Sequence, residues 1–272
     1  MSDFLNDADF QKIRDLIYNE SGIHFSDSNR TILESRLKER LKLLNLTTIS
    51  DYYTALKGSD SELKDFLDSV TTNLTRFFRN QAHYDTFINY VIPDLVERKR
   101  KSGNKKISIW SAGCSTGEEP YTNAMVLKEH LPPDFKIEVI ASDLSLKSLM
   151  KAKEGVYLKN RVTGIPENYL KKYFTEVDNG YKIKPEIGEL IKFDYHNLKF
   201  GSEQRNLDIV FCRNVLIYFD EPAQKNVIDN FWACMAPHSY LFIGHSESLF
   251  GMDTQFKFIK TDWACIYGKV QD

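Results

Sequence analysis

The sequence is poor in the features that mark several classes of protein. Its four cysteines lie far apart with no CxxC pair, and its six histidines lack metal-binding spacing, so we expect neither zinc nor a disulfide framework. No apolar run is long enough to cross a bilayer, and the N-terminus has neither the basic start nor the apolar core of a signal peptide. These absences predict a cytoplasmic protein without a metal site and without direct membrane insertion.

An excess of charge of one sign is also absent. The 36 basic and 38 acidic side chains nearly cancel, so no whole-molecule field would draw the chain onto nucleic acid or an anionic membrane. The 272 residues are 42% hydrophobic and 27% charged, which is typical of a globular protein with one large domain or two smaller ones. Any attraction to a charged partner must therefore be local.

The first hundred residues are predicted to be helical, because apolar residues recur at three- and four-residue intervals and strand-like alternation is absent. Gly22 is placed to end a first helix, a second begins near residues 27–29, and Ser59 with Glu62 has capping-box form. A longer helix is predicted from about Asn80. The side chains expected on buried faces are Phe10, Ile13, Leu16, Ile17, Ile32, Leu33, Leu37, Leu41, Leu44, Leu63, Phe66, Leu67, Val70, Tyr84, Phe87, Ile88, Val91, Ile92 and Leu95.

Beyond residue 106 the pattern changes to short apolar runs that alternate with helical stretches, which indicates a parallel sheet covered on both faces. Strands are predicted at 107–112, 136–142, 207–212 and 239–244, helices at 117–130, 145–153 and 220–236, and a closing antiparallel pair at 256–260 and 263–270. The predicted organisation is a helical domain (1–78), a connecting helix and linker (79–106) and an α/β domain (107–272) that contains a small β-rich insertion (155–191). Residues 97–106, which include no apolar side chain, are expected to form the surface connection.

Polar residues gather where two predicted strands end. The strand at 107–112 runs into the small-residue turn 113–117, where glycines allow a ligand close to the backbone. The next strand ends at Asp143, whose carboxylate could accept hydrogen bonds from two ribose hydroxyls. A structural tight turn and a helix N-cap are the alternative interpretations of these two features. Their combination favours a nucleoside ligand.

Two acidic residues, Glu118 and Glu119, follow that turn at the start of a helix. They argue against a pyrophosphate, because phosphate charge would meet carboxylate charge. The sulfonium and ammonium groups of S-adenosylmethionine suit them better, although acidic residues in a first helical turn also have an ordinary dipole explanation. Residues 212–220 and 71–79 are further polar segments at a strand end and between two helices. Each could instead be structural, with Tyr218 packed under the next helix.

Six segments together resemble the chemotaxis receptor methyltransferases, the CheR family. They are TTNLTRFFR, WSAGCSTGEEPY, ASDLS, FDYHNL, CRNVLIYFD and LFIGHSES, in the family's order and spacing over residues 71–248. The resemblance implies an N-terminal helical domain and the doubly wound α/β sheet of a class I methyltransferase, with a small antiparallel β-subdomain inserted in it. Ser111 and Ser115 depart from the commonest methyltransferase turn but match the habit of this family.

The resemblance also implies the site and the reaction. The residues implied to bind S-adenosylmethionine are Asn73, Thr75, Arg79, Gly113, Glu118, Glu119, Asp143, Asn197, Leu198, Arg213 and Asn214. Arg79 and Tyr218 are implied to lie near the transferable methyl group as catalytic residues. The implied reaction esterifies glutamate side chains of bacterial chemoreceptors and releases S-adenosylhomocysteine. No general base is expected, because a glutamate side chain with a pKa of about 4.3 is already ionised at neutral pH.

The implied partners are the cytoplasmic methylation helices of chemoreceptors, which the chain would meet as a monomer recruited to receptor arrays. Arg36 and Arg40 lie one helical turn apart, opposite the leucine stripe, and are the candidates for binding acidic receptor helices. A solvated charged surface is the alternative. In some members the β-subdomain tethers a receptor tail by strand addition, and the sequence leaves open whether it does so here.

Other functions fit the sequence less well. A methyltransferase for nucleic acid or small molecules is an alternative, but RNVLIY follows the strand at 207–212 where base N-methyltransferases carry an Asn/Asp-Pro-Pro-Tyr turn. A module that binds the cofactor without catalysis is disfavoured by the presence of both Arg79 and Tyr218. A hydrolase elbow at residues 244–248 is disfavoured because its closing glycine is absent.

Overall fold

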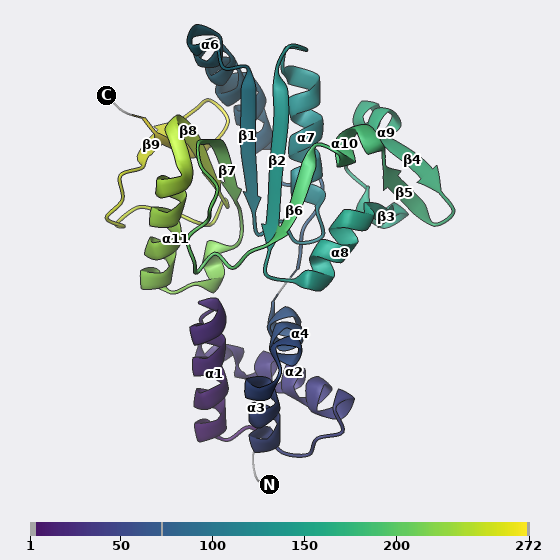
Figure 1. Ribbon diagram of the computed structural model, residues 1–272, viewed down its shortest axis with the longest axis vertical. Coiled ribbons are helices and arrows are strands. Elements are labelled where there is room, and N and C mark those ends of the chain that lie inside the picture. Colours follow the sequence, from purple (N-terminus) through teal and green to yellow (C-terminus); the bar gives the residue numbers. More distant parts are fainter. Residues whose placement is uncertain (1–3, 72, 271–272) are drawn as a thin grey trace.

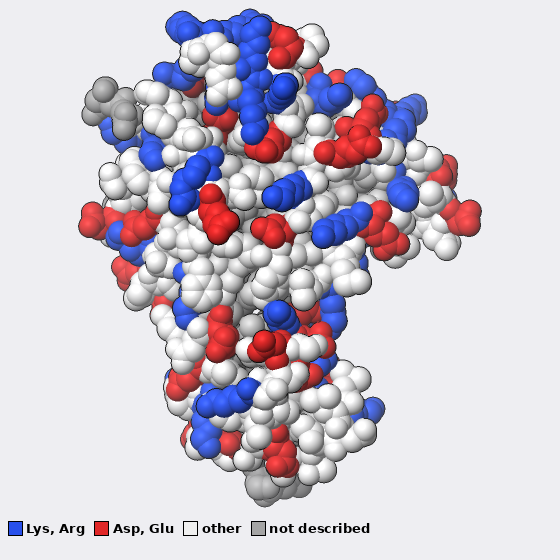
Figure 2. Space-filling view, viewed as in Figure 1, with Lys and Arg blue, Asp and Glu red and all other residues white. Residues whose placement is uncertain are grey.

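The computed structural model describes residues 4–71 and 73–270. Figure 1 shows a helical bundle at one end of the molecule and a sheet flanked by helices at the other, with a smaller sheet at its side. The face drawn in Figure 2 narrows between these two parts and carries intermixed acidic and basic side chains. Within the described residues, no helix is both long and apolar enough to span a membrane.

The helical bundle has a hydrophobic core of its own. Its helices are α1 (Asp7–Ser21), α2 (Arg30–Leu43), α3 (Ile49–Gly58) and α4 (Asp60–Val70), and the short 3-10 turn η1 (Asp27–Asn29) leads into α2. Side chains at helical spacing on each helix point inward, so the bundle closes around one apolar centre.

The predicted helix ends are confirmed in this bundle, with one change. Gly22 ends α1 with φ = 79°, a conformation that costs glycine little. Ser59 caps α4 by accepting a hydrogen bond from the Glu62 backbone N–H at 3.2 Å. The Glu62 carboxylate does not return a bond to Ser59, because it accepts hydrogen bonds from Arg40 and Tyr52 instead. Half of the expected capping box is therefore formed.

For two residues of the α2 region, the prediction of a buried side chain is wrong. Ile32 is 52% exposed and Leu44 is 38% exposed. The buried stripe consists of Leu33, Leu37 and Leu41, which repeat every four residues and cover a narrow arc of the helix. Ile32 and Leu44 fall outside this arc.

The long helix predicted from Asn80 is present as α5 (Gln81–Thr86), the π-helical turn η2 (Phe87–Val91) and α6 (Ile92–Ser102). The predicted surface connection at 97–106 lies at the surface, and its first six residues continue α6. Ion pairs between residues four apart, including Lys101 with Glu97 at 2.5 Å, support this charged helical end. Gly103 then ends the helix with φ = 75°.

Within the described residues, seven strands form one sheet in the order β6-β2-β1-β7-β8-β10-β9. They are β1 (Lys106–Ala112), β2 (Lys136–Asp143), β6 (Ile191–Tyr195), β7 (Leu207–Cys212), β8 (Met235–Ile243), β9 (Lys257–Lys260) and β10 (Cys265–Lys269). The five strands from β6 to β8 run parallel, and β10 is antiparallel to both neighbours, as predicted for the closing pair. The strand order reverses direction between β1 and β7, so the carboxyl ends there flank a crevice.

Helices cover both faces of this sheet, which confirms the doubly wound architecture. They include α7 (Glu118–His130), α8 (Leu146–Glu154) and α11 (Glu221–Cys234). Alternate residues of β7 enter opposite cores, with Ile209 and Phe211 on the side of α7 and Val210 and Cys212 on the side of α11. Strand β6 was not predicted, because its alternate residues are only partly buried at the sheet edge.

The small antiparallel β-subdomain is also confirmed. Its strands β3 (Val156–Leu158), β4 (Phe174–Val177) and β5 (Gly180–Ile183) pair in the order β3-β5-β4. The turn η3 (Lys159–Arg161) and the helices α9 (Glu167–Tyr173) and α10 (Pro185–Gly188) complete it, and α9 was not predicted. Figure 1 places this subdomain beside α7 and α8.

Candidate active site

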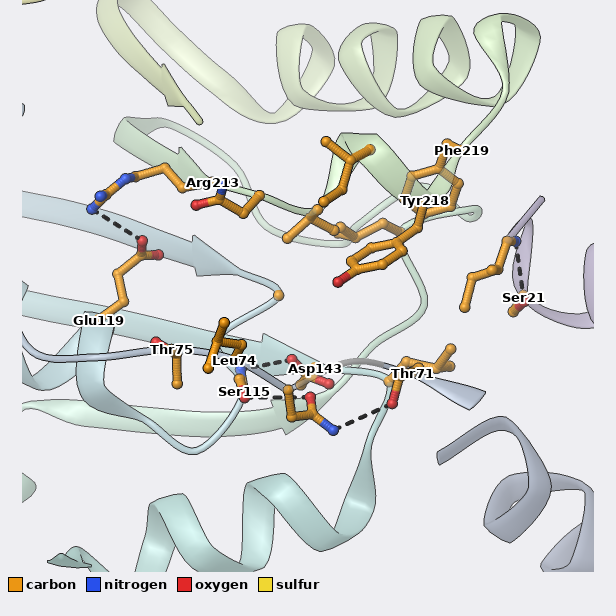
Figure 3. A pocket seen from close by; sticks show the side chains of 18 of the residues that line it. Ser21, Thr71, Leu74, Thr75, Ser115, Glu119, Asp143, Arg213, Tyr218 and Phe219 are labelled. Carbon is orange, nitrogen blue, oxygen red and sulfur yellow. Dashed lines mark hydrogen bonds and ion pairs between the residues drawn. The ribbon is translucent and has the colours of Figure 1, made fainter. Parts of the chain in front are cut away.

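A cavity of about 250 Å³ lies at the carboxyl ends of β1, β2 and β7, where the helical bundle meets the sheet. Figure 3 shows its walls. The lining includes most of the predicted site residues, namely Asn73, Thr75, Arg79, Gly113, Glu119, Asp143, Asn197, Leu198, Arg213, Asn214 and Tyr218. Segments that are more than a hundred residues apart in the chain therefore meet in one cavity.

Opposite charges face each other at the inner end of the cavity. Arg213 Nη1 lies 3.4 Å from Glu119 Oε2, and both side chains are largely buried. Ser111 donates a hydrogen bond of 2.7 Å to the other oxygen of Glu119. Burial raises the pKa of Glu119, and the Arg213 charge opposes that rise.

Arg213 is only partly satisfied by the protein. It donates one hydrogen bond to the backbone oxygen of Arg79, and its guanidinium lies over the Tyr84 ring. Its buried Nε and Nη1 atoms have no hydrogen-bond partner in the described structure. Buried charged donors of this kind normally have acceptors, so this corner is suited to a ligand carboxylate.

Asp143 shapes the opposite wall. Its carboxylate accepts backbone hydrogen bonds from Ser115 at 2.7 Å and from Ser145 at 2.8 Å. Burial raises its pKa, while these two hydrogen bonds act in the opposite direction. Asp143 thus fixes the turn after β1, and because its carboxylate lines the cavity, its remaining lone pairs could accept hydrogen bonds from a ligand.

The turn after β1 requires glycine at its first position. Gly113 has φ = +83°, and a Cβ atom there would lie 2.5 Å from Cγ2 of Val215. Ser115 also has positive φ, at 49°, although it is not glycine. The backbone is therefore bent toward the cavity, and its close approach depends on the missing side chain of Gly113.

The loop at 73–79 contributes polar groups from the side of the bundle. Ser115 Oγ donates to Asn73 Oδ1 at 3.3 Å, and Asn73 Nδ2 donates to Thr71 Oγ1 at 3.3 Å. Arg79 donates to the backbone oxygen of Leu74 at 2.8 Å, which holds its guanidinium beside the cavity. Leu74 is 73% exposed although it lines the cavity, so this loop forms part of the mouth.

Tyr218 projects into the cavity from the turn η4 (Leu216–Tyr218), as Figure 3 shows. The helical bundle holds the backbone of this turn. The His24 N–H donates to the backbone oxygen of Tyr218 at 2.8 Å, and Ile23 forms an antiparallel β-bridge with Phe219. Placement of Tyr218 therefore depends on docking between the two parts of the molecule.

Glu247 supports the neighbouring wall. Its carboxylate accepts backbone hydrogen bonds from Asn214 at 2.9 Å and Ile217 at 3.3 Å, and from Gly244. These bonds fix Asn214 in a left-handed conformation with φ = 60°. The segment 244–248, considered above as a hydrolase elbow, thus serves to hold the turn that follows β7.

Comparison with known proteins gives the family of this chain. Residues 8–71 match the CheR methyltransferase all-alpha domain, and residues 73–265 match the CheR methyltransferase SAM binding domain. The chain belongs to the CheR methyltransferase family. It is 38% identical to the chemotaxis protein methyltransferase of Borreliella burgdorferi over 87% of this chain and 86% of that protein. It is 34% identical to the chemotaxis protein methyltransferase of Escherichia coli over 93% of this chain and 88% of that protein.

The expected resemblance and the expected cofactor are thereby confirmed, and this CheR protein is an S-adenosylmethionine-dependent methyltransferase of the chemotaxis type. The cavity fits that cofactor on its own chemistry. Glu119 can pair with an ammonium group, the unsatisfied donors of Arg213 can bind a carboxylate, and Asp143 can accept from ribose hydroxyls. The cavity also has an apolar surface, including Leu198, for the adenine ring.

One residue expected to bind the cofactor in this CheR protein lies elsewhere. Glu118 is fully buried, does not line the cavity, and forms an ion pair with Arg161 of the β-subdomain. Successive residues on a helix point about 100° apart, and of the two adjacent glutamates Glu119 is the one that lines the cavity.

Arg40, one of the two expected receptor-binding arginines of α2, also differs from expectation. Its buried guanidinium pairs with Glu62 and lies 3.3 Å from Asp65, so Arg40 is not on an exposed basic face. Arg36 is half-exposed and lies 3.4 Å from Glu39. The expected basic surface of this CheR protein is therefore reduced to Arg36 with its exposed neighbours.

Several cavity residues of this CheR protein were not predicted. They are Ser21, Ile23, Val70, Thr71, Leu74, Arg76, Ser115, Leu144, His196, Val215, Ile217 and Phe219. Thr71, Leu74, Arg76, Ser115, Leu144, His196, Val215, Ile217 and Phe219 lie inside the quoted motifs, so the motif segments themselves were the available signal. Ser21, the last residue of α1, and Ile23 just after it carried no such signal, because they reach the cavity through domain docking.

Proposed function

We propose that this protein transfers a methyl group from S-adenosylmethionine to glutamate side chains of bacterial chemoreceptors, as a protein-glutamate O-methyltransferase. The observation that carries the proposal is the combination of Arg79 and Tyr218 at a cavity whose inner end holds the charge pair of Glu119 and Arg213. The names of the related chemotaxis methyltransferases support the biological setting.

The inner end of the cavity would hold the amino-acid part of the cofactor, and Asp143 its ribose. Asn73 and Thr75 would complete the cofactor site from the loop at 73–79, with Asn197 and Leu198 bordering the adenine and Gly113 and Asn214 giving backbone access. Bound S-adenosylmethionine supplies an electrophilic methyl group, whose transfer to a carboxylate oxygen gives a methyl ester and S-adenosylhomocysteine. Residues of this chain must bind the acceptor carboxylate, align it with the methyl group and exclude water.

The acceptor glutamate is already ionised at neutral pH, so the site needs no general base. Arg79 would bind the incoming carboxylate, and the Tyr218 hydroxyl would orient it by donating a hydrogen bond. Charge is neutralised as the new bond forms, so excluding water from the carboxylate and aligning it with the methyl group are the main tasks of the site. An arginine that bound the ground-state carboxylate too tightly would slow the reaction. Arg79 already donates a hydrogen bond to the Leu74 backbone oxygen, which would limit how tightly it binds the carboxylate.

The mouth of the cavity suits a protein acceptor. Leu74 is 73% exposed and Ile217 is 53% exposed, and both line the cavity. Exposed apolar side chains at the entrance would be covered by the substrate and would help to remove water from the acceptor carboxylate. This arrangement supports a folded macromolecular substrate, with one side chain inserted into the cavity.

Arg36 remains the proposed contact of the helical bundle with acidic receptor helices. Its guanidinium is half-exposed on α2, one turn from Ile32, so a receptor helix would meet both charge and apolar surface there. We further propose that the protein acts in the cytoplasm as a monomer and is recruited to receptor arrays by such contacts.

The test is incubation of the protein with radiolabelled S-adenosylmethionine and receptor-containing membranes, followed by mild alkali. Methyl esters of glutamate hydrolyse under these conditions, so the label on the receptor should be released as methanol. Receptors whose acceptor glutamates are replaced with alanine serve as the control. Alkali-stable label, or no label on receptors from a preparation that binds S-adenosylhomocysteine, would refute the proposed acceptor.

A further inference from the structure

We propose that the β-subdomain, defined here as residues 155–190, is a working part of the cofactor site, with Arg161 and Tyr157 as positioning residues. Neither residue lines the cavity, and both act through the backbone turn that does. The inference concerns cofactor binding and goes beyond the identity of the methyl acceptor.

Arg161 joins the subdomain to the end of the cofactor turn. Its guanidinium forms an ion pair with Glu118 and donates to Thr116 Oγ1 at 3.3 Å. Thr116 Oγ1 in turn donates to Glu118 Oε2 at 2.6 Å. Glu118 is 0% exposed, so its charge depends on these two partners. Glu118 immediately precedes Glu119, which lines the cavity, so the contacts that hold Glu118 lie one residue from the cofactor site.

Tyr157 of β3 forms a hydrogen bond to the same turn, residues 113–117. Its hydroxyl donates to the backbone oxygen of Thr116 at 2.7 Å. A Cβ atom on Gly117 would lie only 2.9 Å from this hydroxyl and 2.9 Å from Cβ of Ala152. Tyr157 of the subdomain and Ala152 of α8 therefore approach the turn so closely that position 117 favours glycine.

The turn needs such support because its backbone is unusual. Ser115 has φ = 49°, a region that non-glycine residues seldom adopt, and Gly117 has φ = +94°. A conformation of this kind persists only when surrounding contacts hold it. Asp143 holds the turn through the Ser115 N–H on the cofactor side, and Thr116 is held through the subdomain.

The second wall of the cavity is anchored to the same subdomain. The Phe77 ring packs edge-on against Tyr157 and Phe174, with ring centroids 4.8 and 5.4 Å apart. Phe78, which also has positive φ, packs on Tyr169 at 5.0 Å. These two phenylalanines lie in the loop that carries Asn73 and Arg79. One subdomain thus fixes both the turn and the loop between which the cofactor must fit.

The decisive experiment measures S-adenosylhomocysteine binding to the full-length protein by calorimetry, together with kcat and KM for S-adenosylmethionine. R161A should weaken binding about tenfold to a hundredfold, as expected for loss of a charged hydrogen-bonding group, and should raise KM by more than it lowers kcat. R161K should recover part of the affinity. Y157F retains the ring that packs on Phe77, and it should weaken binding by a smaller factor, about threefold to tenfold.

The matched control is K159A, which lies in the same turn η3 and pairs with Glu176 at the subdomain surface. It should bind as the unaltered protein does. The double variant E118Q/R161A removes the buried charge together with its partner, so it should regain thermal stability while binding remains weak. If affinity returned in full with stability, Arg161 would be merely structural and the proposal would fail.

Wild-type affinity in folded R161A and Y157F would overturn the inference. Failure of the unaltered protein to bind S-adenosylhomocysteine would instead contradict the cofactor placement itself. The two failures are therefore distinguishable. If R161A does not fold, R161K and Y157F carry the same test with smaller expected changes.

Discussion

Single side chains set the charge of the active site. For Arg79, the proposed role in catalysis can be separated from cofactor binding by experiment. It lies beside the cavity mouth, while Glu119 and Arg213 occupy the inner end. Replacing Arg79 with alanine should lower kcat about a hundredfold and change the Kd of S-adenosylhomocysteine less than about threefold. Single-turnover rates and calorimetry measure the two effects. An unchanged single-turnover rate in R79A would remove Arg79 from the mechanism.

Glu119 should make cofactor binding depend on pH. Burial raises its pKa, so in the free protein it takes up a proton at a higher pH than an ordinary carboxyl group does. A cationic ligand needs the ionised form, and affinity should therefore fall as pH drops through this raised pKa, by about tenfold per pH unit below it. Affinity should level off at pH values above the raised pKa.

Calorimetry between pH 5 and 8 measures this dependence, with two buffers to count released protons. E119Q should bind weakly at every pH and show a flatter profile. Asp143, whose pKa is also raised by burial, accounts for any dependence that persists in E119Q. An equally steep profile in the variant would assign the titration to another group.

At the scale of elements, α2 shows two arginines with different surroundings one turn apart. Arg40 pairs with Glu62 inside the bundle, whereas Arg36 is half-exposed. R40A should lower the free energy of unfolding of the bundle by about 3 kcal/mol, because it leaves the Glu62 charge buried. R36A should change it by less than about 0.5 kcal/mol. Chemical denaturation followed by circular dichroism compares the two variants.

Arg36 also tests the proposed receptor-binding surface of α2. R36E should reduce receptor methylation at low salt without changing the affinity for S-adenosylhomocysteine, because Arg36 does not line the cavity. Unaltered methylation at low salt would mean that the charge on α2 is only solvated surface.

For the whole molecule, the main feature is that the helical bundle docks on the sheet through the end of α1. Asn197 donates to the Glu20 backbone oxygen at 2.8 Å, and Lys199 donates to the backbone oxygens of Tyr18 and Asn19. The bonds to Asn19 and Glu20 reach carbonyl groups of the last helical turn, whereas the Tyr18 oxygen also accepts the Gly22 N–H. They also bring Ser21 and Ile23 to the cavity wall.

Removal of the bundle should therefore abolish cofactor binding without unfolding the sheet. A fragment of residues 73–272 retains Phe77 and the core it packs in, yet lacks the cavity wall from the bundle. It should unfold cooperatively and bind S-adenosylhomocysteine at least about a hundredfold more weakly. Thermal unfolding and calorimetry test both statements, and strong binding by this fragment would contradict the interdomain site.

The domain limits are proposals that such fragments can refine. We predicted a helical domain of residues 1–78 and a connecting segment of 79–106. The packing of Phe77 and Phe78 against the β-subdomain favours a unit that begins at residue 73. A fragment of residues 79–272 should accordingly be less stable than 73–272.

The sequence was sufficient for features that arise from neighbouring residues. Helix ends at Gly22 and Ser59, the strands that lead into the cavity, and the positions of Gly113 and Asp143 all follow from local conformational preference and hydrophobic period. The family motifs then supplied most of the cavity lining. These predictions succeeded because backbone geometry and side-chain period are short-range properties.

Partners of buried charges depend on tertiary contacts instead. Arg40 pairs with a residue 22 positions away, and Glu118 with one 43 positions away. Composition and helical spacing treat each as an exposed or ligand-facing charge, because neither property contains the position of a distant partner. The free energy of a buried charge is set by that partner and by the exclusion of water, and both exist only after the chain has folded.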